Sequence, residues 1–539
     1  MQKPSAMYYV VGSGPAGVAC AHALASEGHE VTILDAGVTL EPEREAVARM
    51  VGDKPRAEWS EQEIKVLRTV VPKSGEVPFK LVHGSNYPYQ RPLGAPDIRY
   101  GKLSIRASYA KGGLSNVWGA ALFPYSAEDI RDWPVRYDEL ASGYVAALNM
   151  LPVAGQEDDL SAQFPIAAQS MSALRQSTQI RHLLERSGRL REALLAEGIS
   201  VGGSRLAVNA DEQSDTRSCY YCGYCLHGCP RDVVYSSRHT LQQLISTGRV
   251  HYRPHVIVQS VRETQSGVII EVMDRDGVRS ELSGGRVFLG AGTINSTVIL
   301  LRSLGLYERR VQFKDSQYFL FPMLQTKGSP AVADEALYTL SQAFIELADA
   351  AISPHAVHLQ VYSYNDHLEQ LLDHKLGPLK HVFPKNAVLG RLLLVQAYLH
   401  SAHSGLINGV LRRTSTSDVF DLSEALNSQT KAKVGQVVAK LRANSGALGA
   451  FPVSRMLQIT EPGRGFHTGG SFPMAAHPKV GQTDTLGRPH GMTFTHVIDS
   501  TVFPSIPATT ITLTVMANAY RIGKAVTRLA PESACALRL

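Results

Sequence analysis

Residues 8–37 read YYVVGSGPAGVACAHALASEGHEVTILDAG, and this stretch decides the fold. The apolar, β-rich run from Tyr8 to Val11 predicts a buried strand. A glycine-rich turn and a stretch of small residues up to Gly28 follow, and they predict a helix. A second apolar run ends at Leu34 and is followed directly by Asp35. This order of strand, glycine turn, helix, strand and acid is typical of a dinucleotide-binding unit.

The turn sequence GSGPAG gives each glycine a separate task. Gly12 permits a tight turn, Gly14 lets the backbone approach a pyrophosphate, and Gly17 lets the helix pack on the strand. The helix N-terminus offers unpaired N–H groups and the positive end of a dipole to phosphates. Asp35 follows Gly17 by 18 residues, where an acid accepts hydrogen bonds from ribose hydroxyls. The predicted dinucleotide-binding residues of this unit are Gly12, Gly14, Pro15, Ala16, Gly17 and Asp35.

Length and composition set further bounds. With 539 residues the chain is too long for one simple core, which predicts two or more domains. The net charge of +6 is small for this size, and no basic tract indicates nucleic acid. No apolar run reaches the roughly 18 residues of a membrane span. The first strand begins near residue 7 and leaves no room for a signal peptide, so the cytoplasm is expected, with peripheral membrane association left open.

A second glycine-rich segment, residues 108–121, reads SYAKGGLSNVWGAA. Its glycines let the backbone lie flat against a large planar ligand. The segment resembles the flavin-facing loop of the glucose–methanol–choline (GMC) oxidoreductases, often written GGxSxxNG, and it departs from that pattern in having Val-Trp between Asn116 and Gly119. The resemblance implies an FAD cofactor. It assigns to the flavin-facing loop Gly112, Gly113, Ser115, Asn116 and Gly119.

Two later segments resemble further GMC signatures: residues 286–296 (RVFLGAGTINS) and 497–507 (VIDSTVFPSIP). The first is an apolar strand that breaks into a glycine turn and a helix, and in the family it supports the cofactor from beneath. These matches add Ala291 and Asp499 to the expected cofactor-binding residues. A helix is expected from Thr512 to Ile522, with its N-terminus pointing at the flavin.

Residues 465–474 (GFHTGGSFPM) resemble the family's active-site signature, with His467 at the histidine position. Near neutral pH an imidazole accepts an alcohol proton while hydride leaves the same carbon for the flavin. His467 is therefore the expected base. The family's second active-site position, usually His or Asn, falls on Thr510. Because threonine donates hydrogen bonds but is a poor base, this departure puts the paired mechanism in doubt.

Four of the six cysteines, Cys219, Cys222, Cys225 and Cys229, follow the spacing C-x2-C-x2-C-x3-C-P. This run is found in bacterial iron–sulfur proteins, and without a second run three or four thiolates would hold a single centre. The segment up to His239 resembles the iron–sulfur catalytic subunits of membrane-linked glucose, sorbitol and gluconate dehydrogenases. A structural zinc site stays open as an alternative, because thiolates bind both metals. Unliganded thiols or disulfides stay open as well.

The rest of the chain is less informative. Residues 38–80 are charged and mostly helical by pattern, and we interpret them as an insertion over the dinucleotide. Helix-like amphipathic stretches are expected at residues 335–350, 388–400 and 422–441. Residues 389–398 are interpreted as a core helix or strand rather than a lipid-facing element, because the stretch is short and contains an arginine.

The expected fold is α/β, with a discontinuous Rossmann-like FAD-binding domain and a variable α+β substrate domain. The main part of the FAD domain is assigned to residues 1–305, including the cysteine-rich segment 219–239. The substrate domain is assigned to residues 306–454, and residues 455–539 return to the FAD domain with the active-site residues.

Three functions are compatible with these motifs. The first is an FAD-dependent dehydrogenase of a small sugar- or polyol-like alcohol, whose electrons leave through an iron–sulfur centre to an acceptor protein or quinone. The second is an oxidase of a bulkier or lipid-like alcohol that uses O2, with structural cysteines. The third is a flavin-binding protein with little turnover, because Thr510 breaks the expected pair.

Overall fold

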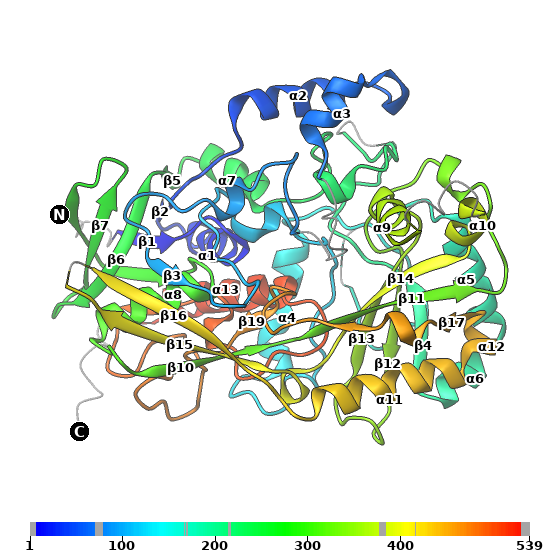
Figure 1. Ribbon diagram of the computed structural model, residues 1–539. Helices are drawn as coiled ribbons and strands as arrows, with labels where there is room; N and C mark the ends of the chain where they lie inside the picture. Colours follow the sequence, from blue (N-terminus) through cyan, green and yellow to red (C-terminus); the bar gives the residue numbers. More distant parts are fainter. Residues whose placement is uncertain are drawn as a thin grey trace.

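The computed structural model describes residues 7–69, 79–166, 168, 171–213, 217–376, 384–415 and 417–529. One half of the molecule is built on a parallel sheet with the strand order β20-β9-β1-β2-β5 (Figure 1). Its strands are β1 (Tyr8–Val11), β2 (Val31–Leu34), β5 (Val250–Arg253), β9 (Arg286–Leu289) and β20 (Thr495–Val497). The sheet confirms the predicted Rossmann-like fold and its assembly from distant segments of the chain.

The register of this sheet brings the motifs together at one edge. Val11 at the end of β1 pairs with Leu34 on one side and with Leu289 on the other. Leu289 also pairs with Val497 of β20. The glycine turn, Asp35 and the segments that follow β9 and β20 therefore all leave the carboxyl edge, where ligands bind in such sheets.

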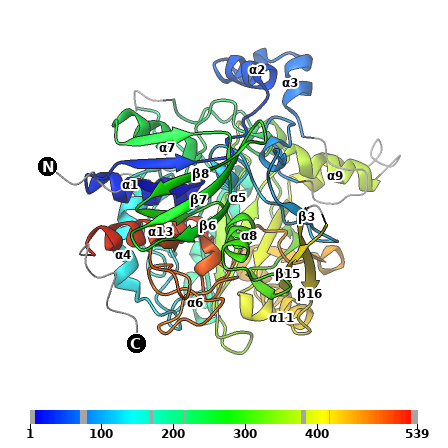
Figure 2. The ribbon, with the colours of Figure 1, turned by 90° about the vertical axis from the view of Figure 1, so that its left-hand side faces the viewer.

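Helices and a small sheet cover the parallel sheet. Helix α1 packs on α13, which packs on α4, while α8 packs on the antiparallel sheet β6-β7-β8 (Figure 2). The elements are α1 (Pro15–Ser26), α4 (Tyr137–Leu148), α7 (Ser237–Ser246), α8 (Thr293–Ser303), α13 (Thr512–Thr527), β6 (Val256–Glu263), β7 (Val268–Asp274) and β8 (Arg279–Gly284). The helix expected at the C-terminal signature is α13.

The other half contains a large, mainly antiparallel sheet with the order β17-β11-β14-β13-β12-β4, and β18 pairs with β11. A second hydrophobic core lies between this sheet and its helices. The strands are β4 (Ile199–Gly203), β11 (Tyr318–Gln325), β12 (Ala343–Leu347), β13 (Val357–Tyr362), β14 (Leu392–Tyr398), β17 (Ala450–Pro452) and β18 (Gln458–Ile459). The helices are α5 (Thr178–Arg189), α6 (Arg191–Ala196), α11 (Thr430–Ala443) and α12 (Ser445–Leu448).

The helix predictions for this half were largely wrong. Residues 335–350 contain strand β12, and residues 388–400 contain β14 after the short helix α10 (Lys385–Leu389). Residues 422–441 begin inside a strand and reach α11 only at Thr430. The physical reason is burial in the sheet. Every residue of β12 is buried, so the pattern of its apolar residues does not distinguish a strand from a helix.

A third sheet, with the order β19-β10-β15-β16-β3, joins the two halves. It contains β3 (Asp97–Arg99), β10 (Arg310–Asp315), β15 (Leu406–Arg413), β16 (Asp418–Ala425) and β19 (Thr468–Gly469). Lys314 and Asp315 at the end of β10 pair with β19, which directly follows His467. The proposed domain limits at residues 305 and 454 stay a prediction.

The helical part of the insertion after β2 contacts the cysteine segment. Helices α2 (Pro42–Gly52) and α3 (Glu61–Leu67) lie at the top of Figure 1. They form a small core with Trp59 and Tyr224, whose rings lie 5.1 Å apart. Phe79 and Lys80, at the end of the same segment, line the cavity beside the glycine turn, so the interpretation of residues 38–80 as a cover over the dinucleotide stays a prediction, and residues 70–78 lie outside the described part.

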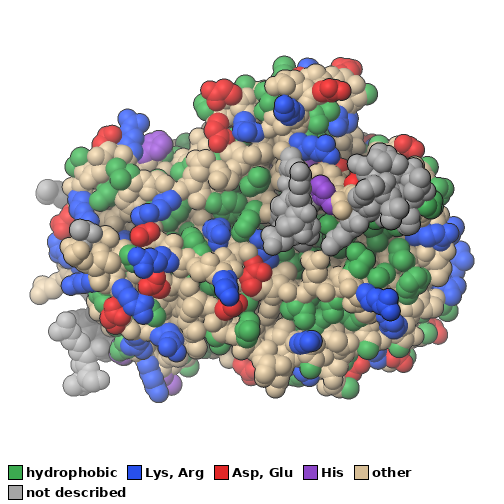
Figure 3. Space-filling model, in the orientation of Figure 1, with side chains coloured by type: hydrophobic (Ala, Val, Ile, Leu, Met, Phe, Trp, Pro, Cys, Tyr) green, Lys and Arg blue, Asp and Glu red, His purple; other side chains and the backbone are tan. Residues whose placement is uncertain are grey.

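Short elements complete the described chain. They are α9 (Asp366–Leu376) and the 3₁₀ turns η1 (Arg56–Glu58), η2 (Tyr87–Tyr89), η3 (Gly113–Asn116), η4 (Cys225–His227), η5 (Val332–Asp334), η7 (Ser401–His403), η8 (Ser454–Met456) and η9 (Ser500–Val502). Within the described ranges, none of the helices has both the length and the apolar composition that crossing a bilayer requires. On the face shown in Figure 3, Lys and Arg side chains are interspersed with acidic ones.

Candidate active site

A cavity of about 330 Å³ extends from the carboxyl edge of the parallel sheet to the large antiparallel sheet. Residues from both ends of the chain line it. Those expected from the sequence are Gly12, Gly14, Pro15, Ala16, Asp35, Gly113, Ser115, Gly119, Ala291, His467, Asp499 and Thr510. The tertiary structure thus gathers the dinucleotide motif and the C-terminal signature around one space.

The first glycine turn has two close backbone contacts and one open position. A Cβ atom at Gly12 would lie 2.6 Å from the Gly290 oxygen, and one at Gly17 would lie 1.9 Å from the Gly12 oxygen. Neither position tolerates a side chain, and Gly17 does not line the cavity. At Gly14 the nearest described heavy atom to a Cβ would be Gly113 Cα, at 3.9 Å. Gly14 therefore leaves room for a ligand group beside the start of α1.

Asp35 is buried at the end of β2 and is held by two hydroxyl groups. It accepts hydrogen bonds from Ser13 and, at 3.1 Å, from the Tyr252 hydroxyl. The Ser13 oxygen in turn accepts the Gly112 N–H at 2.9 Å, which ties the acid to the flavin-facing loop. Burial raises the pKa of Asp35 to about 6 despite these bonds. No sequence signal pointed to Tyr252.

The flavin-facing loop needs its paired glycines, because Gly112 and Gly113 have φ angles of +90° and +57°. The Asn116 amide donates to Gly113 O at 2.8 Å, and its oxygen accepts the Ser236 hydroxyl at 3.1 Å. Ser115 accepts the N–H of Ser237 at 2.9 Å. Gly112 and Asn116 thus hold the loop in shape from outside the cavity, and the segment after the cysteines anchors it.

Asp499 holds the glycine turn that follows β9. Its carboxylate accepts the N–H of Gly292 at 3.0 Å and the Ser296 hydroxyl at 2.6 Å. It also accepts the N–H of Thr501 at 3.0 Å. Burial raises its pKa. These bonds position Ala291 in the cavity wall.

His467 lies in the wall at the far end of the cavity. Its ring stacks on Tyr398, with centroids 4.8 Å apart and planes 22° from parallel. Among the described residues its Nδ1 has no hydrogen-bond partner. Burial lowers the pKa of His467 to about 3, and the positive charge of Lys80 adds to the shift. The imidazole is therefore neutral near pH 7 and has a free lone pair. The preceding residue, Phe466, has a φ of +58°, a costly conformation that often accompanies functional sites.

Thr510 lies in the same cavity wall, just before α13. Its hydroxyl oxygen accepts the Phe123 N–H at 3.2 Å, which leaves the hydroxyl hydrogen available to donate. Thr512 and Val515, in the first turn of α13, also line the cavity, so the positive end of this helix points at it. The structure therefore brings His467 and Thr510 to one space.

Polar and aromatic side chains of the large sheet form the rest of this end, and sequence reasoning missed them. They are Tyr318, Gln360, Tyr362, Gln396 and Tyr398. The Tyr362 hydroxyl donates to Gln360 Oε1 at 3.1 Å. Their alternation along β13 and β14 was the available signal. It was missed because residues 388–400 were interpreted as a helix-like stretch, with a strand left open for 389–398, and no prediction was made for β13.

Cys219, Cys222, Cys225 and Cys229 all line a second, small cavity. They form no disulfide, and burial raises the pKa of each thiol, to about 12 for Cys222 and about 11 for Cys229. Their negative charges raise one another's pKa values as well. The Cys225 sulfur also accepts the Thr339 N–H at 3.5 Å.

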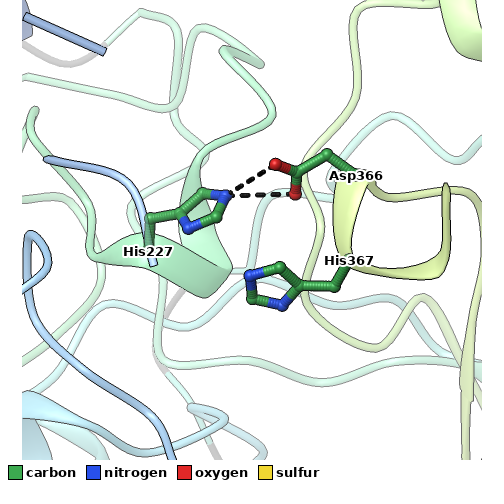
Figure 4. A group of neighbouring side chains, drawn as sticks. All are labelled: His227, Asp366 and His367. Carbon is green, nitrogen blue, oxygen red and sulfur yellow. Dashed lines mark hydrogen bonds and ion pairs between the residues drawn. The ribbon is translucent and has the colours of Figure 1, made fainter. Parts of the chain in front are cut away.

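His227, inside the cysteine run, meets Asp366 and His367 of α9 (Figure 4). Their ligand-type atoms lie within 4.8 Å of one another. However, His227 Nδ1 accepts the Thr69 N–H at 3.0 Å, so the ring proton lies on Nε2 and is donated to Asp366 at 3.0 Å. A metal ion at Nε2 would have to displace this proton and its hydrogen bond to Asp366. We interpret this group as a tether between the cysteine segment and α9.

Comparisons with known proteins agree with this geometry. A family model described as "NAD(P)-binding Rossmann-like domain" matches residues 10–40, and one described as "GMC oxidoreductase" matches residues 419–519. Two solved structures, pyridoxine 4-oxidase from Mesorbium loti and formate oxidase, each superpose with a TM-score of 0.57 at 13% sequence identity. The alignments cover 97% of this chain and 100% and 99% of those chains. A search of curated protein sequences found no match.

The fold and the cavity define a dinucleotide-binding oxidoreductase. Over residues 419–519 the chain matches the GMC oxidoreductases, which are flavin-dependent enzymes that oxidise alcohol-type substrates, and the whole chain shares the fold of the two oxidases.

The cavity fits the FAD that this family implies. Gly14 leaves space at the helix N-terminus, and Asp35 lies where a ribose would be bound. Two buried polar atoms of the cavity wall, Tyr109 Oη and Asn295 Oδ1, have no hydrogen-bond partner within the described ranges. Such buried atoms are costly unless a polar ligand pairs with them.

Proposed function

We propose that the protein is an FAD-dependent dehydrogenase of a sugar- or polyol-like CH–OH group, with electrons leaving through an iron–sulfur centre. The four cysteines Cys219, Cys222, Cys225 and Cys229 would hold this centre. One observation carries the proposal: a further cavity connects the flavin-facing loop to the cysteine segment. Asn116 and Trp118 line it on one side, and Cys225 and Cys229 on the other.

The chain's own residues have distinct roles in the proposed reaction. Bound FAD would supply the acceptor for the hydride. His467, with its neutral ring, would take the proton of the substrate hydroxyl, and Thr510 would donate a hydrogen bond to the substrate oxygen. The N-terminus of α13 favours negative charge in the cavity. Gln360, Gln396 and the nearby tyrosine hydroxyls supply donors and acceptors suited to a substrate with several hydroxyl groups.

The four thiols share one small cavity, which suits a single centre held by several of them. Thiolates bind both iron–sulfur clusters and zinc, so metal analysis has to distinguish the two.

Trp118 supports transfer between the two sites. It lines the large cavity and the connecting one, and its indole N–H donates to Tyr235 O at 2.7 Å, six residues after Cys229. An iron–sulfur centre carries one electron at a time, which an enzyme needs only if its acceptor is a one-electron carrier. The position of Trp118 between the two cavities therefore fits a dehydrogenase.

Metal analysis and one substitution test the proposal. We expect protein purified under anaerobic conditions to contain iron and acid-labile sulfide, with broad absorbance near 400 nm under the flavin bands. Cys222→Ser should abolish reduction of one-electron acceptors and leave anaerobic flavin reduction intact. The matched control is Cys20→Ala, which removes a thiol of α1 that does not line the cysteine cavity. Zinc alone, with turnover unaffected by Cys222→Ser, would refute the iron–sulfur proposal.

The second candidate is an oxidase of a bulkier or lipid-like alcohol, with structural cysteines. Both similar solved structures are of oxidases, which favours this candidate, although 13% identity supports only the fold. Oxygen consumption distinguishes the two candidates. In an oxidase, O2 reoxidises the reduced flavin fast enough to sustain turnover in air. In a dehydrogenase, turnover needs an added one-electron acceptor.

A further inference from the structure

A cation projects into the substrate end of the cavity. Lys80 lines the wall, and its ammonium would lie 3.4 Å from a Cβ atom at Gly119 of the flavin-facing loop. The hydroxyl of Tyr362 would lie 4.0 Å from the same atom. The charge of Lys80 is also near enough to His467 to lower that residue's pKa. Lys80 therefore lines the same cavity as the proposed base and lies close to the flavin-facing loop.

Lys80 has no acidic partner in the part of the chain that the structure describes. The acids that line the cavity there are Asp35 and Asp499. Asp35 is bonded to Ser13 and Tyr252 at the dinucleotide end, and Asp499 to the turn at Gly292. Burial lowers the pKa of Lys80 to about 8, with no opposing carboxylate. Lys80 is only half-buried as a whole residue, but an ammonium partly removed from water without a counter-ion is still costly unless a ligand supplies one.

The mouth of this end carries two more cations, and both are already engaged. Arg464 and Arg106 lie over the Phe79 ring, with guanidinium carbons 4.3 Å and 5.2 Å from its centroid. Arg106 donates to the backbone oxygens of Leu103 and Ile105. They add positive potential to the entrance, which attracts anions, while Lys80 supplies the unpaired charge.

We propose that the substrate alcohol carries an anionic group, a carboxylate or a phosphate, which Lys80 binds beside His467. This inference rests on the proposed function, because it assumes that His467 marks the reacting carbon. The inference narrows the substrate class from neutral sugars and polyols to sugars and polyols that carry a carboxylate or a phosphate. The expected geometry places the anion one side chain away from the base, so the oxidised carbon lies close to the charged group.

Three compounds with one carbon skeleton test the proposal: glycerol, glycerate and glycerol 3-phosphate. Each is titrated anaerobically into the flavin-loaded wild type and into Lys80→Met. Two quantities are measured, the apparent Kd from the change in the flavin absorbance band and the rate of flavin bleaching. Lys80→Arg tests rescue by a retained charge. Lys102→Met, which removes an exposed cation that does not line the cavity, is the matched control.

A charge-assisted hydrogen bond predicts that Lys80→Met raises the Kd of the preferred anion by roughly 10- to 100-fold. Glycerol should change by less than about threefold, and Lys80→Arg should recover most of the loss. Preference for glycerate identifies a carboxylate substrate, and preference for glycerol 3-phosphate a phosphate one.

Two results overturn the proposal. One is a loss of anion selectivity, in either of two forms: the wild type binds all three compounds with equal affinity, or Lys80→Met weakens the binding of all three by the same factor. The other is that Lys80→Met shifts the flavin reduction potential without changing the ratio of anion to glycerol affinity, which would assign Lys80 to the reduced flavin. Anion-selective spectral shifts without any bleaching would instead support the anion site and count against the proposed oxidation.

Discussion

Substitution of Gly14 separates a role in binding the dinucleotide from a role in folding. At this position φ is −66° and ψ is 179°, which any residue adopts, so a side chain causes no backbone strain. A Cβ atom would meet Gly113 Cα at 3.9 Å, an ordinary van der Waals contact. The Gly14→Val variant should therefore fold. Its branched side chain would fill the space where the structure leaves room for a pyrophosphate.

The expected magnitude follows from the hydrogen bonds that a phosphate loses. If the valine displaces the pyrophosphate from two N–H groups at the start of α1, each charge-assisted bond is worth about 1.5–3 kcal/mol. The sum of roughly 3–6 kcal/mol corresponds to a 10²- to 10⁴-fold weaker FAD affinity. The melting temperature of the FAD-free protein should change little, because no protein contact is lost.

The assay compares flavin content, FAD affinity by fluorescence titration and thermal unfolding of the FAD-free protein. Gly17→Ala is the matched control: its methyl group would lie 1.9 Å from the Gly12 oxygen, so it should destabilise the protein itself. A Gly14→Val protein that purifies fully loaded with flavin refutes the placement of the pyrophosphate. Loss of both flavin and fold would show that Gly14 is structural.

Two further predictions concern groups near the reacting end. His467→Ala should slow anaerobic flavin reduction by roughly two to four orders of magnitude, with little change in substrate affinity, and a loss below tenfold would move the base elsewhere. Because the pKa of His467 is about 3, the wild-type rate should show no titration near pH 6.5 from this ring. Asp315 is buried, and burial raises its pKa to about 7 from an unfolded value near 3.8. The folded state then binds the extra proton, so its contribution to stability falls as pH rises from about 4 to 7. Asp315→Asn should thus raise the melting temperature at pH 8 more than at pH 4, and an equal shift at both pH values would contradict the assignment.

The sequence by itself determined the parallel half of the fold. In residues 8–37 the strands are apolar, the glycines permit contacts that no side chain allows, and the acid follows the second strand. These are local requirements of one supersecondary unit, so a single stretch of sequence is enough to predict them. The same holds for the strand before Gly290 and for helix α13 after Thr510.

The strands of the large sheet could not be predicted from local sequence in this way. β12 is buried on both faces, and β14 contacts β11 and β13 from distant parts of the chain. Its residues adopt a strand because those neighbours supply the hydrogen bonds and the buried surface. A short apolar run gives no period from which to tell a buried strand from a buried helix.

The substrate end of the site was decided by tertiary structure alone. His467 was expected from a local motif, but Lys80, Tyr362 and Gln396 lie far from it in sequence and carry no motif. The environment of each residue also depends on the fold: the neutral state of His467 follows from burial, which the sequence does not show. Chemistry that resides in one loop can be predicted from residues. Charge balance within a cavity depends on which distant side chains the fold places together. Only the structure places Lys80 in the same cavity as His467, with no acid to neutralise it in the described part of the chain.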